Sequence, residues 1–73
     1  MTREQIRQIK RTFRHYHSAI VDGVTIQQRL NSYNGQLIPN GWYDVYSNWA
    51  KLNDRPLSFN AAIDLMEEYF ARK

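Results

Sequence analysis

Five basic side chains near the amino terminus are the residues of this sequence best suited to binding chemistry. They recur at helical spacing, at Arg3, Arg7, Lys10, Arg11 and Arg14. On a helix with about 100° between successive residues, they fall within about 100° of one another and form a ridge about 16 Å long. A row of arginines can make two-pronged hydrogen bonds to successive phosphates. The spacing therefore indicates a surface for nucleic acid or another polyanion, with an acidic protein partner or a solvated helix flank as the alternatives.

A second set of residues suited to binding lies in the aromatic stretch WYDVYSNWAKLN, residues 42–53. Read as a helix, it places apolar side chains over half of its circumference, more than a surface helix normally carries. Trp49 lies in the middle of this apolar half and is predicted to be in the core. Trp42, Tyr43 and Tyr46 are predicted to anchor a protein interface, because tyrosine and tryptophan bury a large area while keeping a polar tip.

Residue patterns for other kinds of chemistry are weak. His15 and His17 lie about 200° apart on a helix and cannot chelate one ion, and Asp64, Glu67 and Glu68 have the spacing of a solubilising helix face. The chain has no cysteine, which excludes a thiolate nucleophile or metal ligand. We therefore expect no catalytic residue, no cofactor, no metal site, no small-molecule substrate and no enzyme activity.

Sequence motifs for reading nucleic acid bases are equally weak. A helix-turn-helix with Gly35 in its turn would put Gly41 inside the recognition helix, and no zinc-finger, leucine-zipper or RNA-binding aromatic pattern is present. Any binding to nucleic acid would have to rest on phosphate contacts.

Length and charge point to one small domain with a basic end. The chain has 73 residues, a net charge of +3 and a pI near 9.5, and we expect residues 1–73 to form a single helical domain. Residues 1–20 hold five basic residues against one acidic residue, Glu4, so the positive charge is concentrated there. Neither a membrane span nor a signal peptide is recognisable, which predicts a soluble, cytoplasmic protein.

Hydrophobic periodicity predicts an all-α fold, a small irregular or orthogonal four-helix bundle. Two capping boxes begin helices, Thr2 with Gln5 and Thr25 with Gln28. The expected helices span residues 3–22, 26–33, 41–53 and 59–71, with the aromatic helix at the centre of the core.

One segment has two interpretations. Asn34-Gly35 either ends a helix over 26–33 or forms the type I′ turn of a β-hairpin spanning 24–38. We favour the helix, because only Gln36, Leu37 and Ile38 would remain for the second strand before Pro39.

These patterns predict a non-catalytic interaction module, a small regulator, adaptor or inhibitor that binds a protein or itself through the aromatic helix. The alternative is a nucleic-acid-binding protein that uses the basic ridge of the first helix on the phosphate backbone.

Overall fold

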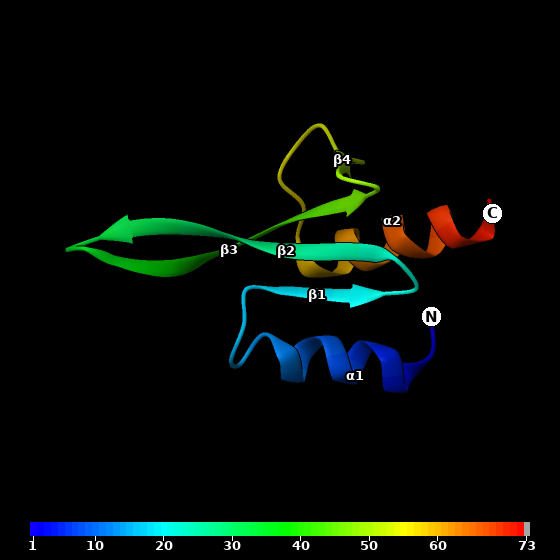
Figure 1. Cartoon of the computed structure of the whole chain (residues 1–73), viewed down its shortest axis with the longest axis horizontal. Helices are drawn as coiled ribbons and strands as arrows, with labels where there is room; N and C mark the ends of the chain where they lie inside the picture. The colour runs from blue at the N-terminus through cyan, green and yellow to red at the C-terminus, as the bar shows by residue number, and fades with distance from the viewer. Residues whose placement is uncertain (73) are drawn as a thin grey trace.

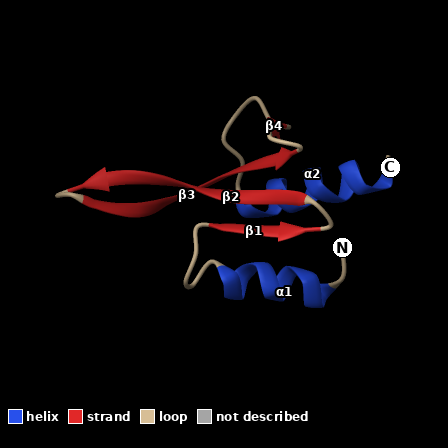
Figure 2. Ribbon diagram, in the orientation of Figure 1, coloured by secondary structure: helices blue, strands red, loops and turns tan. Residues whose placement is uncertain are grey.

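The protein has an α+β fold and not the predicted all-α four-helix bundle. The structure, a computed structural model, describes residues 1–72. Within this range the chain forms two helices and one four-stranded antiparallel sheet with strand order β1-β2-β3-β4 (Figures 1 and 2). In chain order the elements are α1 (Arg3–Thr12), β1 (Ser18–Val21), β2 (Val24–Tyr33), β3 (Gln36–Ser47), β4 (Ala50–Lys51) and α2 (Phe59–Ala71).

The first helix begins where predicted and ends ten residues early. The Thr2 hydroxyl accepts from the Gln5 backbone N–H at 3.1 Å, and the Gln5 side chain accepts from the Thr2 N–H at 2.9 Å, so this capping box is confirmed. The helix ends at Thr12, and β1 replaces the expected last turns. The physical reason is the Asp22-Gly23 turn, whose φ angles of 48° and 80° suit a two-residue hairpin connection.

The expected helix over 26–33 is wrong, and the hairpin interpretation is correct. Asn34 and Gly35 have φ angles of 50° and 77° and join β2 to β3. Pro39 does not end the second strand, because proline is tolerated where a strand edge faces solvent. β3 therefore continues to Ser47.

The expected aromatic helix over 41–53 is also wrong. Most of this stretch lies in β3 and β4, which are joined by a tight turn at Asn48 and Trp49. The side chains alternate between the two faces of the sheet with the two-residue period of a strand. Tyr43, Val45 and Ser47 therefore share one face. Trp49, predicted to be in the core, is fully exposed.

The core lies between one face of the sheet and the two helices. The helix over 59–71 is confirmed as α2, with the Ser58 hydroxyl capping its first turn. The buried apolar residues come from both helices and from β1, β2 and β3: Ile9, Ala19, Val24, Ile26, Val45, Ala62, Ile63 and Met66. The opposite face of the sheet is left uncovered by any helix in residues 1–72 (Figure 1). Neither of these helices has the length and apolar composition needed to cross a membrane.

Candidate interaction surface

The β2–β3 hairpin extends well beyond the rest of the molecule (Figure 1). The β1–β2 pairing reaches only to Ser18 opposite Gln27, and β4 pairs only with Tyr46 and Ser47. Residues 30–42, which we call the hairpin arm, therefore form a two-stranded ribbon within the part of the chain that the structure describes. Such a ribbon buries little of its own surface.

The hairpin arm is uncharged and exposes large apolar side chains. Residues 30–42 contain no Asp, Glu, Lys, Arg or His, although 23% of the whole chain is charged. Tyr33 is 67% exposed, Leu37 64%, Trp42 47% and Ile38 44%. Depletion of charge together with exposed aromatic and aliphatic groups is typical of the centre of a protein interface.

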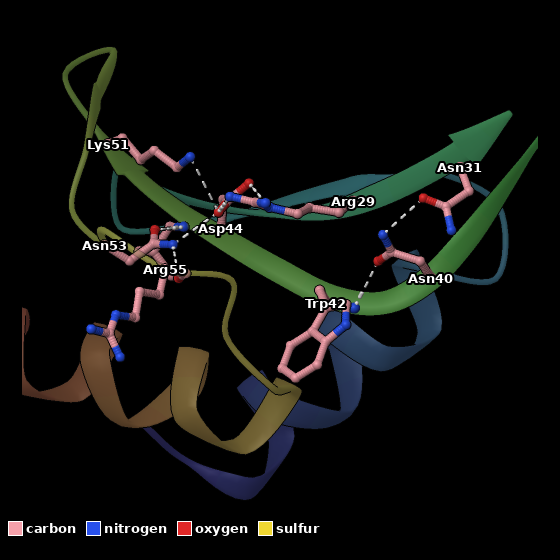
Figure 3. A network of polar contacts seen from close by, with 9 residues as sticks. Arg29, Asn31, Asn40, Trp42, Asp44, Lys51, Asn53 and Arg55 are labelled. Carbon is pink, nitrogen blue, oxygen red and sulfur yellow. Dashed lines mark hydrogen bonds and ion pairs between the residues drawn. The ribbon is translucent and has the colours of Figure 1, made fainter.

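A bulge sets the direction of the arm. Between the pairs Gln28–Tyr43 and Leu30–Pro39, residues 40–42 of β3 lie opposite Arg29 alone. Gly41 takes a φ of 85°, which glycine adopts without strain. The Asn40 side chain accepts from the Trp42 N–H at 3.0 Å and donates to Asn31 at 3.1 Å, which ties the bulge to β2 (Figure 3).

A charged network lies at the base of the arm, on the open face of the sheet (Figure 3). Asp44 is 7% exposed and accepts two hydrogen bonds from Arg29 and one from Asn53, with Lys51 at 3.6 Å. Burial by itself raises the pKa of Asp44, but the hydrogen bonds from Arg29 and Asn53 and the two positive charges together outweigh burial. The pKa of Asp44 is therefore below its ordinary value, and the carboxylate stays ionised at neutral pH.

Asn53 links this network to the loop that follows β4. Its side-chain oxygen accepts from the Val45 N–H at 2.9 Å, while its amide donates to Asp44 and to the Arg55 carbonyl oxygen. One buried side chain thus satisfies backbone groups of two segments. The arrangement is structural, because both polar atoms of the Asn53 side chain and both carboxylate oxygens of Asp44 already bind neighbouring groups.

The three aromatic residues predicted as interface anchors are in three different environments. Trp42 lies at the base of the arm, and its ring points to the helix side of the sheet (Figure 3). Tyr43 packs between Phe13 and Phe59, with ring centroids 5.5 and 5.4 Å away. Tyr46 lies half-buried on the open face, so the structure does not bring the three residues together.

The open face of the sheet carries a second apolar region. Ile20, Thr25 and Tyr46 are cross-strand neighbours, and Ile20 is largely exposed. Together with Trp49 they border a shallow depression of about 500 Å³. The exposed tryptophan of this region, Trp49, lies outside the hairpin arm. The sequence had predicted it to be in the core.

The predicted basic surface is exposed but shorter than expected. Arg3, Arg7, Lys10 and Arg11 lie on α1, whereas Arg14 lies in the turn after it. Within residues 1–72 none of these four arginines forms an ion pair or a side-chain hydrogen bond. The Lys10 ammonium lies 5.5 Å from the centre of the Phe59 ring, a cation–π contact.

Sequence reasoning missed the arm itself, although two signals for it were available. Asn34-Gly35 is the strongest short hairpin signal, and the absence of charge over residues 30–42 is visible in the sequence. Comparisons with protein-family models, curated proteins and solved structures give no match. The surface itself must therefore support any assignment of function.

Proposed function

We propose that this protein is a non-catalytic interaction module that binds a protein partner through the hairpin arm. The observation that carries the proposal is the combination of projection, absence of charge and exposed apolar groups in residues 30–42. Monomeric proteins rarely leave apolar groups gathered on a projecting element without a partner for them. Tyr33 and Ile38 lie on one face of the arm and Leu37 on the other. Binding over either face would bury exposed apolar side chains, which supplies a favourable free energy of transfer from water.

The uncharged arm favours a protein over a nucleic acid as its partner. Phosphate backbones are bound by basic side chains, and the arm offers none. Its polar residues are asparagine, serine and glutamine, which can form hydrogen bonds around an apolar centre without desolvating a charge.

The test is a matched pair of variants. Leu37→Thr with Ile38→Thr removes apolar surface from the arm and keeps residue types that favour strands. Tyr16→Thr makes the same kind of change at an exposed position of the body, outside the arm and outside the depression beside Trp49. We expect the tagged wild-type chain and Tyr16→Thr to co-purify the same protein from source cells after nuclease treatment, and the double variant to lose it. Equal recovery by all three chains, or recovery of no protein by a chain that is also monomeric in solution, would overturn the proposal.

A second candidate function is nucleic-acid binding through the exposed face of α1 and Arg14. It is favoured by one observation, the absence of acidic partners for Arg3, Arg7, Arg11 and Arg14 in residues 1–72. Exposed, unpaired arginines on one side of a helix are able to contact successive phosphates.

Salt dependence tests this second function. With four or five phosphates contacted, the logarithm of the affinity for duplex DNA or RNA should fall with the logarithm of salt concentration at a slope of about −4. Replacing Arg7, Arg11 and Arg14 by Glu should abolish binding, whereas Arg55→Glu, at an exposed position away from α1, should weaken it far less. The absence of retardation at low salt would rule this function out.

A further inference from the structure

The two edges of the hairpin arm differ in their capacity to pair with another strand. On the β3 edge, Pro39 has no backbone N–H, and Gly41 lies in the bulge. Residues 29–33 of the β2 edge include neither a proline nor a positive φ angle. Proteins commonly block free strand edges with proline, bulges or charge. In the arm, the β3 edge is blocked in this way and the β2 edge is open.

The register shows which backbone groups the β2 edge presents. The Gln28 N–H donates to the His17 carbonyl oxygen at 2.8 Å, so Gln28 directs its backbone groups toward the β1 side. Because these groups alternate in direction along a strand, Leu30 and Ser32 direct theirs to the same side. Among residues 1–72 no strand lies beside β2 beyond this point, so these backbone groups face outward.

We propose that the β2 edge of the arm pairs antiparallel with the same edge of a second copy of this chain, about a two-fold axis at Asn31. This centre places Leu30 opposite the second copy's Ser32, in pairs whose outward N–H and carbonyl groups bond to each other. Asn31 then lies opposite its own counterpart in the closer, non-hydrogen-bonded type of pair. The result is an intermolecular four-stranded sheet.

Charge explains why a second copy fits this edge. A two-fold contact places identical surfaces against each other, so charges near the axis would repel their own counterparts. Residues 30–42 carry no charge, and Arg29 at the end of the edge is paired with Asp44. The same register places Tyr33 of the second copy opposite Arg29, on the face of the sheet that Arg29 shares with Asp44. In this register, therefore, no like charges face each other along the paired segments.

Pairing would also stabilise the arm. A two-stranded ribbon is only marginally stable in water. A four-stranded sheet with apolar groups on a shared face can be stable by itself. Because the proposal uses the arm, it rests on the proposed function and names the partner as a second copy.

A cysteine placed at the two-fold axis tests the register. The chain has no cysteine, so Asn31→Cys introduces a single thiol. We expect it to form a disulfide-linked dimer readily in a glutathione redox buffer, because residues opposite each other in a non-hydrogen-bonded pair lie within the reach of a disulfide. Gln36→Cys, exposed on the β3 strand of the same arm, is the control and should crosslink far more slowly. Equal crosslinking of both variants would overturn the proposed register.

A proline pair tests the edge without a crosslink. Ser32→Pro removes an outward N–H from β2, and Leu37→Pro removes the corresponding N–H from β3, directly opposite. In sedimentation equilibrium at high micromolar protein concentration, we expect the wild-type chain and the Leu37→Pro variant to be dimers. We expect the Ser32→Pro variant to be a monomer. Far-ultraviolet circular dichroism should show that both variants keep the sheet.

The outcomes separate this inference from the proposed function. A wild-type monomer in the high micromolar range, or a Ser32→Pro variant that dimerises like wild type, overturns the second copy as partner. If the Leu37→Thr and Ile38→Thr variant still loses a different co-purifying protein, the proposed function stands without this inference. If the wild-type chain neither dimerises nor recovers any protein, both fail.

Discussion

Arg29 and Asp44 join β2 to β3 at the base of the hairpin arm through two parallel hydrogen bonds, of 2.8 and 2.9 Å. The pair lies where the register between the two strands changes, next to the bulge that directs the arm. A two-pronged contact between a guanidinium and a carboxylate fixes orientation as well as distance. The ionised state of Asp44 therefore helps to hold the arm in place relative to the body.

Acid should weaken the fold through Asp44. The pKa of Asp44 is lowered in the folded chain, so its ionised form stabilises the fold above the unfolded pKa of about 3.9. This contribution is lost as the pH falls through the lower, folded-state pKa. Urea unfolding between pH 7 and pH 2 should show a steeper loss of stability for wild-type chain than for Asp44→Asn. Parallel pH profiles of the two chains would contradict this role of the carboxylate.

Removing the Asn53 side chain should destabilise the fold without altering any charge. Asn53→Ala leaves the Val45 N–H without its partner and removes a hydrogen bond to the Arg55 carbonyl oxygen. Each buried group left unpaired costs about 1–3 kcal/mol, so we expect the free energy of unfolding to fall by at least about 1 kcal/mol. Asn60→Ala, at an exposed position of α2, is the matched control and should change it by less than about 0.5 kcal/mol.

Gly41 should resist substitution because of its backbone conformation. Its φ is 85°, and a Cβ placed there would meet nothing within 4 Å, so the cost of Gly41→Ala is backbone strain alone. We expect a loss of about 1–2 kcal/mol in thermal or urea unfolding. Gly41→Asn should cost less, since asparagine tolerates positive φ better than alanine does. Equal stability of Gly41→Ala and wild type would show that the bulge relaxes.

The sequence predicted the two helix starts correctly because each is decided by residues close in the chain. The Thr2–Gln5 capping box and the Ser58 cap require no distant contacts. The rest of the fold depends on tertiary packing. Thr25-Ile26-Gln27-Gln28 also matches a capping box, but in the sheet Ile26 is completely buried beside its cross-strand neighbour Val45.

The aromatic stretch shows how a period can be misread. A strand with bulky residues on both faces, such as Tyr43 and Tyr46, also shows an apolar half-circumference when its residues are plotted on a helix. Two Asx-Gly dipeptides, Asp22-Gly23 and Asn34-Gly35, form hairpin turns in the structure, but the prediction ended a helix at the first and favoured a helix end at the second. The exposure of Trp49 could not be predicted, since it depends on a turn that lacks glycine.

Trp49 should be replaceable by glycine with a gain in stability. Asn48 and Trp49 form the two-residue turn between β3 and β4, with φ angles of 51° and 66°, a conformation that favours Asn-Gly and strains a bulky residue. The ring is fully exposed, so its removal costs no buried surface. Relief of the strain, less the entropy that glycine adds to the unfolded chain, should raise the free energy of unfolding by about 0.5–1 kcal/mol.

Trp49→Ala separates the ring from the backbone. Alanine removes the indole and keeps the strain, so its stability in the same urea titration should stay within about 0.5 kcal/mol of wild type. A gain for glycine without a gain for alanine would identify the φ angle as the source of the effect, whereas a loss in both variants would mean that the indole itself stabilises the fold. A tryptophan kept exposed at a cost in stability is typical of a binding residue. Trp49→Ala should therefore reduce any binding that uses the depression beside Ile20 and Tyr46, with the arm-dependent binding left intact.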